Sequence, residues 1–128
     1  MPTTGDSFVL LVDDNPETLN LFASALEFEG IEVRKASSVK RALEVLYDGS
    51  RRPALIITDL LMPQTSGWDF LKHLRAEPAL KSLPVIVITG ADPGESEQLA
   101  DMVLQKPIDP VQLAETVRAR LRPTPGTN

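Results

Sequence analysis

The sequence predicts a single α/β domain built around a parallel β-sheet. Short runs rich in Val, Ile and Leu alternate along the chain with segments that repeat apolar residues at helical spacing. Strands that alternate with helices form βαβ units, whose right-handed crossovers make the strands parallel. Acidic, hydroxyl and amino side chains also stand at the ends of several apolar runs, the edge at which open α/β sheets bind ligands.

Five apolar runs predict the strands. Most are apolar throughout, which indicates burial on both faces of the sheet. The second run differs, because Ile31 and Val33 alternate with polar neighbours, and this pattern favours an edge strand. The predicted strands span residues 8–12, 31–36, 54–58, 85–89 and 102–105.

Amphipathic helices are predicted between the strands from apolar residues spaced i, i+3, i+4 and i+7. Asn15 and Pro16 are typical of a helix N-cap and first position, and this first helix is expected to end near Gly30. A third helix is expected from Gly67 to about Glu77, and Asp109-Pro110 begins the last. The inner faces are Leu19, Phe22, Ala23 and Leu26, then Val39, Ala42, Leu43 and Leu46, and finally Leu113, Ala114, Val117 and Leu121.

Bulk properties exclude several classes of protein. The 128 residues suit one domain, and the chain contains no cysteine, which excludes disulfides, thiol nucleophiles and zinc–thiolate sites. Residues 1–7 lack the layout of a signal peptide, and no apolar run could span a bilayer, so a cytoplasmic location without membrane association is expected. A net charge of −5 gives no reason to expect nucleic-acid binding by this domain.

The residues at the strand ends form a chemically coherent set. Asp13 and Asp14 end FVLLVDD, Asp59 ends ALIITD, Thr89 ends VIVIT, and Lys106 ends MVLQK. Two carboxylates about 4 Å apart repel by roughly 4 kcal/mol at an effective dielectric constant near 20, so a cation is expected among them. Oxygen ligands without cysteine or a nearby histidine favour Mg²⁺ over zinc. A carboxylate beside such a metal can attack phosphorus to form an acyl phosphate.

Four motifs together resemble the receiver domain of two-component response regulators. They are VDDN at 12–15, TDLLMP at 58–63 with Gly67 following, VITG at 87–90, and KP at 106–107. The resemblance covers residues 7–122, and residues 123–128 have the composition of a tail or the start of a linker. It implies a flavodoxin-like fold, with a five-stranded parallel sheet in the order 2-1-3-4-5 flanked by helices.

The resemblance also implies roles for the clustered residues. Asp59 would be the phosphoacceptor. Mg²⁺ would be bound directly by Asp14, Asp59 and the backbone carbonyl of Leu61, with Asp13 acting mainly through a metal-bound water.

Two further residues would hold the phosphoryl group. Lys106 would bind its oxygens, and Thr89 would rotate inward to form a hydrogen bond with it after transfer. Lys106-Pro107 matches the cis-peptide position of the family.

Each residue taken alone has a simpler interpretation. Asp13 and Asp14 could stabilise the start of a helix through its dipole. Thr89 could be an ordinary hydroxyl at a strand end, and Lys106 a solvated surface charge. His73, the only histidine, is expected to face solvent rather than carry phosphate.

Two features depart from the family pattern. Receivers usually carry Tyr or Phe three residues before the lysine, whereas this chain has Val103. The stretch from Thr89 to Lys106 is also shorter than usual by roughly five residues, about 1.4 helical turns, so the fourth helix should be short, irregular or absent.

The function expected from these residues is that of a phosphoacceptor receiver that takes a phosphoryl group from a histidine kinase or phosphotransfer protein. Because the receiver would catalyse its own modification, its status as an enzyme is a matter of definition. One alternative is a vestigial receiver-like interaction module. Another is an aspartate-dependent phosphohydrolase, which usually has a second aspartate two residues after the nucleophile, where this chain has Leu61.

Overall fold

The sheet has five parallel strands in the order β2-β1-β3-β4-β5, as predicted. The computed structural model describes residues 8–48, 52–60, 67–90 and 99–121. The strands are β1 (Val9–Val12), β2 (Val33–Ala36), β3 (Leu55–Asp59), β4 (Val85–Thr89) and β5 (Met102–Gln105). The position of β2 at one edge confirms the interpretation of its alternating pattern.

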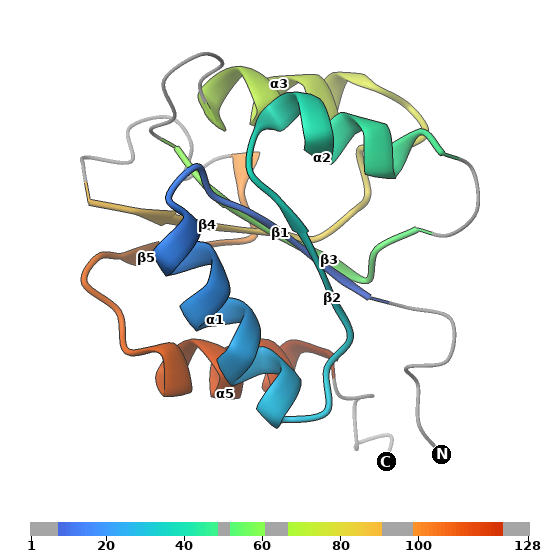
Figure 1. The fold of residues 1–128 in the computed structure, drawn as a ribbon. Coiled ribbons are helices and arrows are strands. Elements are labelled where there is room, and N and C mark those ends of the chain that lie inside the picture. The colour runs from blue at the N-terminus through green and yellow to red at the C-terminus, as the bar shows by residue number, and fades with distance from the viewer. Residues whose placement is uncertain (1–7, 49–51, 61–66, 91–98, 122–128) are drawn as a thin grey trace.

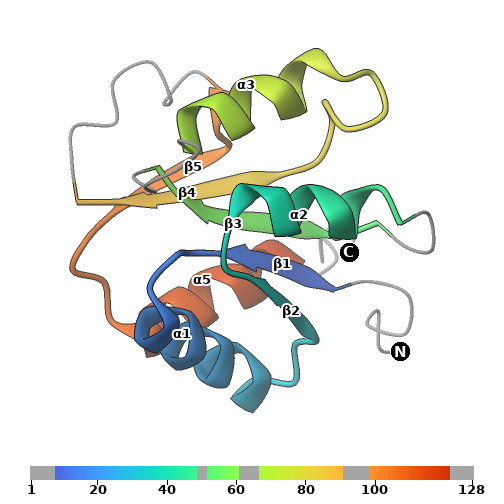
Figure 2. The same ribbon diagram turned by 45° about the horizontal axis from the view of Figure 1, so that its top comes forward.

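Helices cover both faces of this sheet (Figures 1 and 2). Two of them, α1 and α5, lie side by side on one face, and α2 and α3 lie on the other. Their bounds are α1 (Pro16–Phe28), α2 (Val39–Leu46), α3 (Gly67–Ala76) and α5 (Pro110–Leu121). Residues 91–98, on which the expectation of a short fourth helix depends, lie outside the described residues.

Strand β1 shows how the apolar runs build the core. All four of its residues are buried. Alternate side chains of a strand point to opposite faces, so Val9 and Leu11 pack in the cluster beneath α1 and α5, while Leu10 and Val12 pack beneath α2 and α3. The hydrophobic sheet therefore has a core on each face. Packing on both faces fixes the position at which each strand ends.

Local signals set the helix boundaries. The Asn15 side chain accepts a hydrogen bond from the Thr18 backbone N–H at 3.0 Å, which satisfies a donor left free at the start of α1. Beyond the end of α1, Gly30 has a φ of 83°, a conformation that glycine adopts without the steric cost of a side chain. The predicted capping of α1 is thus confirmed.

The strand limits differ slightly from those predicted. Phe8 and Ile31 are buried but precede β1 and β2, and β3 extends to include Asp59. Their apolar character placed these two residues in the predicted strands, whereas strand limits depend on pairing with a neighbour, which one sequence does not display.

Arg75 at the end of α3 forms a junction that the sequence did not indicate. Its guanidinium donates hydrogen bonds to the backbone carbonyls of Leu99 at 2.7 Å and of Leu83 at 2.7 Å. It also pairs with the Asp101 carboxylate at 3.0 Å, and the same Asp101 oxygen accepts the Val85 backbone N–H at 2.7 Å. The junction ties α3 to the beginnings of β4 and β5.

We expect Arg75→Ala to lower the free energy of unfolding by about 2 kcal/mol, because partly buried acceptors lose their donor. Urea denaturation measures the change. Arg118→Ala, which removes one exposed ion pair, is the matched control and should cost less than about 1 kcal/mol. Equal losses in the two variants would contradict a structural role for the junction.

Candidate functional site

The predicted site residues come together at the carboxyl edge of the sheet. Asp13 and Asp14 follow β1, Asp59 ends β3, Thr89 ends β4, and Lys106 follows β5. Because neighbouring strands are parallel, all these ends lie at one edge.

The strand register places these residues next to one another. Asp59 pairs with Ile88, one residue before Thr89, and Thr89 pairs with Gln105, one residue before Lys106. The backbone N–H of Lys106 donates to the Thr89 carbonyl at 2.9 Å, which fixes the two chain segments against each other.

Three carboxylates form the acidic part of the site. Asp13, Asp14 and Asp59 each offer an oxygen within 4.8 Å of the others. Asp13 and Asp59 are 3% and 7% exposed, whereas Asp14 is exposed to solvent. Oxygen donors so close together, with one open side, fit a hard divalent cation that keeps some of its water, so the cluster could bind a metal.

Lys106 supplies positive charge to this cluster. Its Nζ lies 2.8 Å from Asp59 Oδ2 and 3.8 Å from Asp13 Oδ2. Burial lowers the pKa of Lys106, but the hydrogen bond that its ammonium donates to Asp59 and the charges of Asp59, Asp13 and Asp14 outweigh it, so the pKa is raised above its ordinary value. The side chain is therefore an ammonium ion at neutral pH.

Asp13 is the most buried of the three carboxylates. Burial raises its pKa above the ordinary 3.8, opposed by the Asn15 backbone N–H and Lys106, while the charges of Asp59 and Asp14 raise it further. The Asn15 N–H donates to Asp13 Oδ1 at 2.9 Å. Sequence analysis identified Asn15 as a helix cap, and the structure gives its backbone this second contact.

Thr89 occupies a buried position next to an exposed glycine. Thr89 is fully buried, and the following residue, Gly90, is exposed. A Cβ at Gly90 would lie 3.8 Å from the Lys106 Cβ, in ordinary van der Waals contact with the lysine side chain.

Other residues singled out from the sequence lie away from the cluster or outside the described residues. Leu61 falls outside them. Val103 is half-buried and packs against the core beneath α2 and α3. His73 is exposed, as expected, but its Nε2 lies 2.8 Å from the Tyr47 hydroxyl, a contact between α2 and α3 that helical periodicity alone could not reveal.

Comparison with known proteins agrees with this geometry. The family model described as "Response regulator receiver domain" matches residues 9–118. The chain belongs to this family. The Lys106–Pro107 peptide bond is cis, as the receiver family implies.

Individual relatives cover this receiver domain to different extents. The polar-differentiation response regulator DivK of Brucella anthropi is 30% identical over 88% of this chain and 94% of its own length. The phosphate regulon transcriptional regulatory protein PhoB of Pseudomonas aeruginosa is 33% identical over 92% of this chain, which spans only 53% of that protein. The crystal structure of the phosphorylated cyanobacterial phytochrome response regulator RcpA has a TM-score of 0.76 and 26% identity, with 91% of each chain covered.

Within the described residues, no helix is long and apolar enough to cross a membrane.

The raised pKa of Asp13 predicts a pH-dependent gain in stability from Asp13→Asn. A carboxyl whose folded-state pKa is raised contributes stability that is complete below the unfolded value of 3.8 and is lost as the pH rises through the folded value. In metal-free buffer, Asp13→Asn should therefore raise the thermal midpoint at pH 7 by a few degrees and change it little at pH 3. The amide oxygen can still accept the Asn15 N–H.

Thermal melts of both proteins at the two pH values measure this difference. Glu115→Gln, an exposed neutralisation on α5, controls for net charge. An equal gain in the control, or a gain at pH 3 as large as at pH 7, would contradict burial strain at Asp13.

Proposed function

We propose that this domain accepts a phosphoryl group on Asp59 from a histidine kinase or a histidine phosphotransfer protein, and that the transfer requires Mg²⁺. The observation that carries the proposal is the Asp59 carboxylate, held 2.8 Å from the Lys106 ammonium beside two further carboxylates. A receiver whose site had decayed into an interaction surface would have no need to maintain this charged arrangement. The crystallised relative RcpA is described as phosphorylated.

Four groups would hold the metal. Asp14, Asp59 and the Leu61 carbonyl would be ligands, and Asp13 would act mainly through a bound water. When bound, Mg²⁺ would neutralise the carboxylates and the incoming phosphoryl oxygens, as it does in other phosphoryl-transfer sites.

The transfer itself would be a nucleophilic displacement. A carboxylate oxygen of Asp59 forms a bond to phosphorus, the P–N bond of the donor phosphohistidine breaks, and the imidazole nitrogen keeps the electron pair. Lys106, already charged, exchanges its contact with Asp59 Oδ2 for the new phosphoryl oxygens. The Thr89 hydroxyl then forms a hydrogen bond with the same group.

The signal would leave the site as a conformational change within a receiver unit of residues 7–122. Val103 replaces the usual aromatic residue and is half-buried in β5. The response would therefore depend on the segment that joins Thr89 to Lys106, rather than on an aromatic ring that moves between buried and exposed positions.

Asp59→Asn should abolish uptake of a phosphoryl group from acetyl phosphate and Mg²⁺, because an amide oxygen is a poor nucleophile. Intact-protein mass spectrometry detects the adduct. Asp48→Asn, which alters an exposed ion pair elsewhere, should label like the unmodified protein.

Three other outcomes would reject the proposal. Labelling that persists in Asp59→Asn would place the acceptor elsewhere. An unmodified protein that never labels would indicate an interaction module, and continuous phosphate release would indicate a hydrolase.

Mg²⁺ should stabilise the folded domain, because only the folded state gathers the carboxylates. At a concentration of 100 times the dissociation constant, the gain is about 2.7 kcal/mol. Thermal melts with and without Mg²⁺ measure it, and Asp14→Asn should remove most of the gain. A shift of equal size in Asp14→Asn and in Asp48→Asn would rule out a shared acidic metal site.

A further inference from the structure

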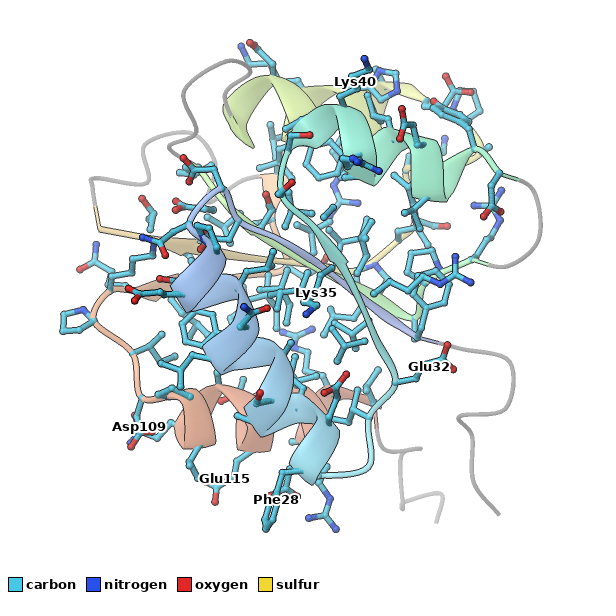
Figure 3. All side chains as sticks on the ribbon, in the orientation of Figure 1. Phe28, Glu32, Lys35, Lys40, Asp109 and Glu115 are labelled. Atoms are coloured by element: carbon cyan, nitrogen blue, oxygen red, sulfur yellow. The ribbon has the colours of Figure 1, made fainter. Side chains whose placement is uncertain are left out.

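Helix α1 exposes an apolar stripe that the described residues of the domain leave partly uncovered. Leu21, Ala25 and Phe28 are spaced i, i+4 and i+7, so they share one face of the helix. Leu21 is 57% exposed and Phe28 is 89% exposed. In Figure 3 the Phe28 ring projects away from the body of the domain, on the same side as Glu115 of α5. A phenylalanine this exposed marks a candidate contact surface.

An apolar groove lies at the opposite end of the same face. It has a volume of about 460 Å³ and runs between the start of α1 and the segment that joins β5 to α5. Leu21 forms part of its rim. Its lining residues are Thr18, Leu21, Phe22, Lys106, Pro107, Ile108 and Pro110.

The exposed Phe28 side chain and the groove are well separated along α1. Thr18 and Phe28 are ten residues apart in one helix. At about 1.5 Å per residue their Cα atoms lie roughly 15 Å apart, so Phe28 cannot reach the groove of its own chain.

We propose that a second copy of this chain docks on the face formed by α1 and α5, with Phe28 of each copy inserted into the groove of the other. A two-fold axis perpendicular to α1 near Ala25 exchanges the two ends of the helix. The axis therefore brings the Phe28 side chain of each copy to the groove of the other. The resulting interface is isologous, the arrangement most common in homodimers.

Charges at the two ends agree with this arrangement. Glu17 is exposed at the groove end of the stripe, and Arg118 lies at the Phe28 end, where its guanidinium is 2.9 Å from Glu29 Oε1. Arg118 is 56% exposed, which leaves further N–H donors for an incoming carboxylate. The two-fold axis places Glu17 of one copy near Arg118 of the other.

A second copy explains both ends of this face. A helix from a different protein could fill the groove, but that contact would leave Phe28 in water. Tyr47, another large exposed side chain, directly follows α2, the helix that lies on the opposite face of the sheet, and supplies a matched control.

Sedimentation equilibrium of the full chain, from micromolar to millimolar concentration, tests the proposal. The unmodified protein should approach the dimer mass, and Phe28→Ser should weaken association at least tenfold. Because Phe28 contributes little to the core, the variant should keep its fold and still take up phosphate from acetyl phosphate. Tyr47→Ser should associate like the unmodified chain.

Disulfide trapping tests the geometry. The chain has no cysteine, so Thr18→Cys and Phe28→Cys can be prepared as separate variants, each with one thiol. When the two variants are mixed under oxidation, they should form the mixed disulfide much faster than either variant forms a disulfide with itself. The mixed disulfide should also form faster than the one between Thr18→Cys and Tyr47→Cys.

Three results would overturn the inference. The first is an unmodified protein that stays monomeric at every concentration. The second is a Phe28→Ser variant that associates as strongly as the unmodified protein. The third is a disulfide that forms as fast between Thr18→Cys and Tyr47→Cys as between Thr18→Cys and Phe28→Cys. Loss of phosphotransfer from a histidine-containing partner in Phe28→Ser, without any change in association, would assign the face to that partner instead. The sedimentation and disulfide-trapping readouts do not depend on Asp59 accepting a phosphoryl group, so the dimer and the proposed phosphorylation can fail separately.

Discussion

Repulsion among three carboxylates is the constraint on which the functional edge of this domain depends. Asp13, Asp14 and Asp59 are gathered within 4.8 Å, and the ion pairs of the described residues place one cation, Lys106, against them. The repulsion among these carboxylates lowers the free energy of unfolding, so another part of the fold must offset it.

The hydrophobic sheet provides that stability. Strands β1, β3 and β4 are buried along their whole length, with a core on each face. The paired strands fix where each chain segment ends, and the side chains that follow are held in place whether or not they attract one another. The binding residues therefore lie at the edge of a hydrophobic core whose stability does not depend on them.

Both the hydrophobic sheet and the polar residues at its edge could be predicted from the sequence, because each has a local sequence pattern. Apolar runs identified the strands, and polar residues at the ends of four of the five runs, those of β1, β3, β4 and β5, identified the functional edge. The Asn15 cap was visible for the same reason. Contacts between distant elements were not predictable, since Arg75 and Asp101 are separated by 26 residues and neither belongs to a repeating pattern.

Exposure was equally hard to foresee. Periodicity identified the buried stripe of α1 correctly, but it did not show that Phe28 would project from the other side of the helix. That outcome depends on where α5 packs against α1, which is a property of the assembled fold.

The strand order has a consequence for how the protein is made. The acidic residues come from β1 and β3, whereas the compensating ammonium follows β5, close to the end of the domain. A ribosome releases the carboxylates long before it releases Lys106. During synthesis the three carboxylates therefore emerge without the ammonium that pairs with them, and the complete site can form only when the last strand adds to the edge of the sheet.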